Sequence, residues 1–202
     1  MALVSLVIHH DPGSAGSGAY DRNMHNVQFI KDRELYDRVI LSEVPRAEKF
    51  LWLGTSALKD LYVKKGSRMV PFLEVISDLV AKGVKIRLLH AKEPGPAFRK
   101  DFDKYPTLLN GIERVLCPRV HFKSVVVDGR FAYTGSANLT GAGMGIKSVD
   151  NRNFENGIIT TDPVLVGHIM DQFDSIWMGT RCNGCKRKKY CSDYRLLLQA
   201  DT

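Results

Sequence analysis

The hydrophobic positions of this chain alternate between two spacings. Short runs rich in β-branched and aromatic residues are typical of strands, and they occur at 27–30, 50–53, 84–89 and 114–116. Between them, apolar residues recur every three or four positions, which predicts helices. Strands separated by helices are typical of an α/β fold.

Three helices are predicted before residue 110. The first spans 33–49, and Pro45 bends it or ends it early. The second begins at Pro71 and is closed by Gly83. The third is a basic, exposed helix over 97–109. The apolar stripe of the second helix consists of Phe72, Ile76, Leu79 and Val80.

A last strand at 153–161 is followed by a helix that begins at Asp162 and Pro163, a capping side chain followed by proline at the first helical position. We interpret His168 as a packed core residue of this helix. The expected fold class is α/β, with a mixed β-sheet flanked by helices on both faces. The expected apolar face of the last helix is Val164, Leu165, His168, Ile169, Phe173 and Ile176.

Candidate catalytic side chains are most concentrated in residues 119–138, RVHFKSVVVDGRFAYTGSAN. Residues 120–127 predict a strand, and Asp128-Gly129 is a two-residue hairpin turn signal. Because side chains at i and i+2 of a strand share a face, we expect His121 and Lys123 to project together. Taken alone, Asp128 is equally a turn former without chemistry.

The returning strand ends in Gly135-Ser136-Ala137-Asn138. Glycine permits close backbone approach, and a hydroxyl and an amide supply neutral hydrogen-bond donors. An imidazole, a cation and several donors at one end of a hairpin predict a phosphate site with a nucleophile or base beside it.

The full spacing, H-x-K-x4-D-x6-G-S-x-N, resembles the signature of the phospholipase D superfamily at every fixed position, and the resemblance is strongest over 84–177. It implies a phospholipase D-like α-β-α sandwich and a phosphodiesterase that forms a covalent phosphohistidine. Because the motif occurs once, it also implies a homodimer in which two motifs meet across a two-fold axis, as in small bacterial nucleases. The catalytic residues it implies are His121, Lys123, Asp128, Ser136 and Asn138.

On this interpretation, His121 of one subunit attacks phosphorus. The symmetry-related His121 protonates the departing oxygen and then activates water. Lys123, Ser136 and Asn138 stabilise charge on the other oxygens, so catalysis needs no metal ion.

Two features follow the motif. Members of the superfamily carry an acidic residue at about the position of Glu155, where a carboxylate fixes the imidazole tautomer and raises its basicity. The alternative is a solvated strand residue.

The Gly-rich stretch 141–149 either shapes the rim of the site or is a flexible connection.

The chain has four cysteines, Cys117 and the tail set Cys182-x2-Cys185-x5-Cys191. In a reducing compartment such a cluster favours metal binding, with Cys117 as the fourth ligand of a structural zinc ion. A [4Fe–4S] cluster is the rival and disulfides are the alternative without metal. The tail also holds a basic run, which is either a contact for nucleic-acid phosphates or a solvated charge cluster. The run is Lys186, Arg187, Lys188 and Lys189.

Length and composition fit one domain, with 202 residues of which 44% are hydrophobic. We expect a flexible leader or extension at 1–23, a catalytic domain at 24–179 and a metal-binding tail at 180–202. No run approaches the ~18 apolar residues that cross a bilayer, so a soluble, cytoplasmic protein is expected. The net charge of +7 favours polyanions as partners.

Three functions remain open from the sequence. An endonuclease acting on DNA or RNA is favoured by the charge, the basic run and the single motif. A phospholipid phosphodiesterase uses the same chemistry. A nucleic-acid-binding module that keeps the fold without catalysis is the third, and the intact motif argues against it.

Overall fold

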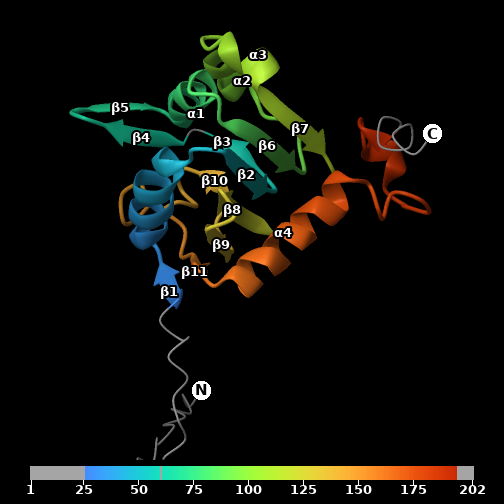
Figure 1. Cartoon of the computed structure of the whole chain (residues 1–202). Helices are drawn as coiled ribbons and strands as arrows, with labels where there is room; N and C mark the ends of the chain where they lie inside the picture. The colour runs from blue at the N-terminus through green and yellow to red at the C-terminus, as the bar shows by residue number, and fades with distance from the viewer. Residues whose placement is uncertain (1–25, 60, 195–202) are drawn as a thin grey trace, which may run out of the picture.

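The computed structural model describes residues 26–59 and 61–194, and a seven-stranded sheet forms their centre (Figure 1). Strands β2, β6 and β7 run parallel to one another, and the remaining neighbours pair antiparallel. In order across the sheet the strands are β1 (Val27–Lys31), β11 (Asn156–Thr160), β9 (Phe131–Gly135), β8 (Lys123–Val127), β2 (Phe50–Thr55), β6 (Lys85–His90) and β7 (Ile112–Leu116).

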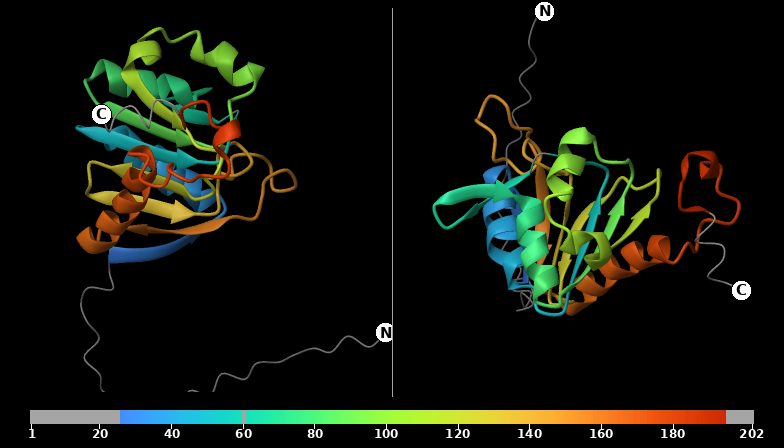
Figure 2. Two further views of the ribbon diagram at one scale, coloured as in Figure 1. Left: turned by 90° about the vertical axis from the view of Figure 1, so that its right-hand side faces the viewer. Right: turned by 90° about the horizontal axis from the view of Figure 1, so that it is seen from above.

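Helices cover both faces of the sheet (Figure 2). One face carries η2 (Leu35–Glu43), a helix with π-type hydrogen bonding, together with α1 (Phe72–Ala81). The other face carries α4 (Pro163–Trp177), where Val166 packs with Val126 and Ala132. The expected α/β class with a mixed sheet flanked by helices is therefore confirmed.

The ends of α1 and α4 follow from their sequences. Pro71 precedes α1, and Gly83, at φ +88°, adopts the left-handed conformation that ends it. The carboxylate of Asp162 accepts the backbone N–H groups of Val164 and Leu165 at 2.9 and 3.0 Å, which caps α4.

The expected apolar face of α4 is wrong in part. Val164 is 64% exposed, and Leu165 and His168 are exposed as well. Phe173 is buried as expected, and the helix also buries Val166, which the prediction left out. His168 is therefore a surface residue and not a packed core histidine.

The predicted helix over 97–109 is two short helices, α2 (Pro96–Phe102) and α3 (Thr107–Gly111). Pro106 explains the break, because its ring removes a backbone donor and disfavours a helical residue before it. The first predicted helix also stops early, at a tight turn over Val44–Arg46 that contains Pro45.

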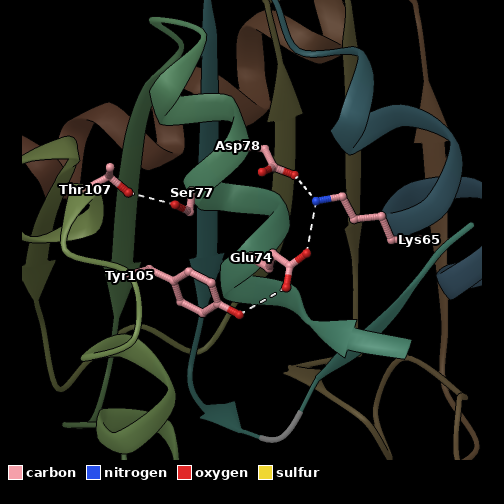
Figure 3. A network of polar contacts seen from close by, with 6 residues as sticks. All are labelled: Lys65, Glu74, Ser77, Asp78, Tyr105 and Thr107. Carbon is pink, nitrogen blue, oxygen red and sulfur yellow. Dashed lines mark hydrogen bonds and ion pairs between the residues drawn. The ribbon is translucent and has the colours of Figure 1, made fainter. Parts of the chain in front are cut away.

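The sequence reasoning missed the hairpin of β4 (Tyr62–Lys65) and β5 (Arg68–Pro71), whose turn contains Gly66 at φ +62°. Lys65 ties this hairpin to α1 by ion pairs with Glu74 and Asp78 at 3.0 and 2.6 Å (Figure 3). Figure 3 also shows a hydrogen bond from the Tyr105 hydroxyl to the Glu74 carboxylate, and another between the hydroxyls of Ser77 of α1 and Thr107 of α3. These contacts tie α1 to the hairpin and to α3. A short parallel pair, β3 (Leu58–Lys59) with β10 (Leu139–Thr140), completes the strands.

The expected leader at 1–23 lies outside the described residues. None of the helices in the described part of the chain is long and apolar enough to span a membrane. After α4 the described tail contains one short turn, η4 (Lys188–Tyr190), and folds toward the end of β7 (Figure 1).

Candidate active site

The motif occupies the β8–β9 hairpin, and its functional groups gather at the open end. Lys123 begins β8 and pairs with Gly135 at the end of β9. Gly135 in turn pairs with Gly157 of β11, so three strands meet at this end of the sheet. The Asp128-Gly129 turn closes the opposite end, with φ of 53° and 68°, which confirms the predicted turn.

Lys123 is a buried cation, with 6% of its surface exposed. Its Nζ donates to the backbone carbonyl of His121 at 2.5 Å. Burial lowers the pKa of the Lys123 ammonium, and the negative charge of Glu155 acts in the opposite direction. The carboxylate of Glu155 therefore lies near the cation of the motif.

Glu155 precedes β11 and is fixed by hydrogen bonds. Its carboxylate accepts the hydroxyl of Ser136 and, at 2.9 Å, the side-chain amide of Asn153. Its backbone carbonyl accepts the N–H of Asp32 at 2.9 Å. In the described part of the chain the carboxylate is hydrogen-bonded to these groups and not to His121.

Asn138 uses its amide oxygen to hold the segment after β2. That oxygen accepts the hydroxyl of Thr55 at 3.2 Å and the backbone N–H groups of Ser56 and Ala57 at 3.1 and 3.2 Å. The two backbone N–H groups on one atom identify it as the carbonyl oxygen, and the Thr55 hydroxyl also bonds the carbonyl of Ala57 at 2.9 Å. The amide NH2 of Asn138 takes no part in these three contacts.

His121 lies in the segment before β8 and its side chain is exposed. The strand was predicted from residue 120 but begins at Lys123, so strand alternation does not set the direction of the imidazole. The backbone carbonyl of Val120 accepts the hydroxyl of Ser56 at 3.2 Å. The segment that Asn138 holds therefore anchors the residue next to His121.

Asp128 is the one motif residue that the structure places apart. Its carboxylate accepts the backbone N–H groups of Glu48, Lys49 and Phe50 at 3.0, 2.8 and 2.9 Å. Burial alone raises the pKa of Asp128, but these three bonds and the positive charge of Arg130 outweigh it, so the pKa is lowered. The geometry fits a residue that joins the hairpin turn to the start of β2.

Gly135 is required by its surroundings, which the sequence reasoning did not find. A Cβ there would lie 2.4 Å from the carbonyl oxygen of Asn156 and 2.6 Å from the hydroxyl of Tyr133. Tyr133 is fully buried, and burial raises its pKa although the backbone of Ala137 acts in the opposite direction. Gly157, which pairs with Gly135, could have indicated this close approach from the sequence, because a glycine inside a strand often marks a site where another backbone comes near.

The tail brings the four cysteines around one hollow of about 280 Å³. None of them is in a disulfide. Burial raises the pKa of Cys182 and of Cys191, whereas the backbone N–H of Arg187 lowers the pKa of Cys185. Over residues 26–59 and 61–194, no three His, Cys, Asp or Glu side chains are arranged to hold a metal ion.

The tail is also bonded to the strand end before His121. Leu116 donates its N–H to Asp193 at 2.6 Å and accepts the thiol of Cys191 at 3.2 Å. Arg119, two residues before His121, reaches the sulfur of Cys185 at 3.9 Å. The side chains of the basic run, Lys186, Arg187, Lys188 and Lys189, are all exposed.

A curated relative, the mitochondrial cardiolipin hydrolase of Chlamydomonas reinhardtii, is 27% identical over 105 residues. The match covers 52% of this chain and 44% of that protein, so the chain spans less than half the length of this relative.

Solved structures share the fold at low sequence identity. The phospholipase D family member Nuc from Salmonella typhimurium gives a TM-score of 0.55 at 20% identity, over 75% of this chain and 93% of that chain. NucT from Helicobacter pylori gives a TM-score of 0.55 at 13% identity, over 74% of this chain and 93% of that chain. The archaeal chromatin protein TrmBL2, whose structure shows a novel mode of DNA binding, gives a TM-score of 0.51 at 15% identity. The match covers 75% of this chain and 52% of that chain.

The family model described as "Cardiolipin synthase, PLD-like domain" matches residues 40–177, which include all the motif residues and Glu155. With that match over more than half of its length, the chain belongs to the phospholipase D-like phosphodiesterase superfamily.

Proposed function

We propose that this protein is an endonuclease that cleaves phosphodiesters through a phosphohistidine at His121, as a homodimer. One observation carries the proposal. Buried Lys123, Ser136 held by Glu155, and the amide of Asn138 gather at one end of the hairpin, next to the exposed His121. A cation and neutral donors beside an accessible imidazole suit a phosphate group that is attacked by nitrogen.

The proposed reaction has two displacements. The imidazole of His121 attacks phosphorus and forms a P–N bond, while the P–O bond to the leaving oxygen breaks. The imidazole of the second subunit's copy of the motif gives that oxygen a proton. The same imidazole then removes a proton from water, whose oxygen attacks phosphorus and breaks the P–N bond.

Each remaining motif residue has a proposed role. Lys123 and the NH2 of Asn138 stabilise the negative charge on the non-bridging oxygens. Glu155 positions the hydroxyl of Ser136, and its charge favours the protonated form of Lys123. We propose that Asp128 acts structurally, because its oxygens are bonded to the backbone at the far end of the hairpin.

The chemistry has no step that requires a metal ion, because Lys123 and Asn138 supply the charge and donors that a cation otherwise contributes. The metal of the proposed enzyme is structural, a zinc ion or an iron–sulfur cluster at the four cysteines. Unpaired thiols are usual in a reducing compartment, so we propose a cytoplasmic location. The catalytic domain is proposed to span 24–179 and the tail 180–202.

The homodimer follows from the need for a second imidazole. The motif occurs once in the chain, and the first displacement requires both a nucleophile and an acid on opposite sides of phosphorus. A two-fold axis through the open ends of two hairpins supplies both groups. Sedimentation of the purified chain at twice its mass of 22.7 kDa tests this part of the proposal.

Nucleic acid is the proposed substrate, either DNA or RNA. The net charge of +7 attracts polyanions, and the exposed run 186–189 lies on the tail that is bonded to the strand end before His121. The DNA binding described for TrmBL2, which shares the fold, agrees with a polynucleotide partner.

A phospholipid is the second candidate, and a specific cavity favours it. A largely apolar hollow of about 630 Å³ lies between the sheet and α1 to α3, and Leu139, next to Asn138, is part of its wall. That volume is in the range of small-molecule pockets. The relative named as a cardiolipin hydrolase agrees with this alternative.

One experiment separates the candidates. The purified chain is incubated in EDTA with labelled single- and double-stranded DNA, RNA, and vesicles of phosphatidylcholine with cardiolipin. We expect shortened polynucleotide and an acid-labile phosphate on the protein, both lost in His121→Ala. Release of a lipid headgroup without polynucleotide cleavage would replace the nuclease by the lipid enzyme. Polynucleotide binding without turnover would remove the enzyme assignment.

A further inference from the structure

The tail from 180 to 194 contributes no residue to the hydrophobic core clusters. None of its residues is buried, and it contains the three-residue turn Lys188–Tyr190. Ordering fifteen residues costs conformational entropy that exposed side chains do not offset. Small segments of this kind are usually held by a cross-link, either disulfides or a metal. A cross-link would add to the hydrogen bonds that Leu116 makes with Asp193 and Cys191.

The four cysteines are the groups placed to supply it. Three come from the tail and Cys117 comes from the segment between β7 and His121, and all four line the same hollow. Cys182 and Cys185 flank a tight turn in which Cys185 donates its N–H to the carbonyl of Cys182 at 3.0 Å, with Gly184 in the left-handed conformation at φ +74°. Such a C-x2-C turn is a common spacing of zinc ligands.

The charges around the hollow fit a tetrathiolate. Four thiolates around one Zn²⁺ carry a net charge of −2, and arginine side chains compensate such a charge well. Three arginines line the hollow together with the cysteines: Arg119, Arg181 and Arg187. No carboxylate is part of its lining. These three arginines would offset the negative charge of a tetrathiolate centre.

We propose that Cys117, Cys182, Cys185 and Cys191 bind one zinc ion, and that this centre fixes the basic tail against the segment that carries His121. Binding converts four S–H groups and Zn²⁺ into four Zn–S bonds and releases four protons. The thiols move inward to the roughly 2.3 Å of a Zn–S bond. The tail permits this movement because none of its described residues is packed into the core.

Zinc binding should affect how the proposed nuclease binds its substrate, although the zinc ion takes no part in the reaction. Cys117 lies four residues before His121, and the exposed run 186–189 lies between two of the ligands. With zinc bound, the run is held against the segment that leads to His121 and contributes phosphate contacts. Without zinc, the run detaches and polynucleotide binding becomes weaker and less dependent on salt.

The test uses the full chain purified without chelator, with zinc per chain and reactive thiols as readouts. We expect about one zinc per chain, thiols that react slowly, and four that react after chelation. Cys191→Ser and Cys117→Ser each lose the metal. Asn183→Ala, an exposed residue between two ligands, and His121→Ala both keep it, so failure of the nuclease proposal leaves this result unchanged.

Trypsin provides a second readout that does not require the serine variants to fold. Cleavage at 186–189 should accelerate by about tenfold or more when zinc is removed from the wild-type chain, and slow again when zinc is restored. No zinc with four reactive thiols, or no reactive thiols until a reductant is added, would overturn the proposal. Iron with absorption near ~400 nm would overturn the assignment to zinc.

Discussion

Replacing Asp128 should destabilise the fold without altering the chemistry. The Asp128 carboxylate accepts three backbone N–H groups, from Glu48, Lys49 and Phe50, at 3.0, 2.8 and 2.9 Å. Hydrogen bonds to a charged group contribute about 1.5–3 kcal/mol each, and partial exposure reduces this to about 1 kcal/mol each. Asp128→Ala should therefore lower the free energy of unfolding by about 3 kcal/mol, with a further contribution because alanine tolerates φ +53° poorly.

Asp128→Asn is the matched control. Asparagine adopts positive φ readily and keeps one acceptor oxygen, the one that receives both Lys49 and Phe50. Its NH2 then faces the N–H of Glu48, so we expect a loss of about 1–1.5 kcal/mol. In urea, with a slope of about 2 kcal/mol per molar, the midpoints should fall by about 1.5 M for alanine and about 0.6 M for asparagine.

The pH dependence provides a separate check. The pKa of Asp128 is lowered in the folded protein from its ordinary value of 3.8. Its contribution is therefore fully present above pH 3.8 and is lost as the pH falls through the folded pKa. The stability difference between wild type and Asp128→Ala should narrow below about pH 4. The reasoning is refuted if Asp128→Asn unfolds like wild type in urea and yet no longer cleaves phosphodiesters at a temperature where it is folded.

Three further changes test the open end of the hairpin. Lys123→Met should abolish cleavage and raise the free energy of unfolding by about 1 kcal/mol, because a buried cation is removed; a lower urea midpoint would contradict this. Gly135→Ala should cost about 1–3 kcal/mol in thermal unfolding, since its Cβ would lie 2.4 Å from the carbonyl oxygen of Asn156; full stability would show that the strands separate easily. Glu155→Gln removes the charge that raises the pKa of Lys123, so the alkaline loss of cleavage should move to lower pH, and an unshifted pH profile would disprove that coupling.

Local signals predicted the strands and the turn because those depend on neighbouring residues. The Asp128-Gly129 turn and the strands near 27–30, 50–53 and 84–89 were found this way. The face that α4 buries was predicted in part: Phe173 is buried as expected, but Val164 and Leu165 are exposed, and Val166, which the prediction left out, packs on Val126 and Ala132. Periodicity gives an apolar stripe, and only the neighbouring elements decide which part of it is buried.

The motif identified the site residues but did not separate chemistry from support. Asp128 contacts residues about eighty positions earlier in the chain, and no local pattern indicates that contact. The need for Gly135 arises from the ring of Tyr133 and the backbone of β11, which also meet it only in the fold. Glu155 was expected to hold the imidazole, and its carboxylate is bonded to Ser136 instead.

Asn138 explains why the last motif position is an amide. Its oxygen accepts three donors of segment 55–57, and Ser56 of that segment holds the carbonyl next to His121. A carboxylate at 138 would accept the same donors, but its second oxygen would repel the phosphate that Lys123 attracts. An apolar side chain would leave buried donors without an acceptor, which costs about 1–3 kcal/mol for each. Only a residue with an acceptor on one side and a neutral donor on the other both places the imidazole and favours an anion beside it.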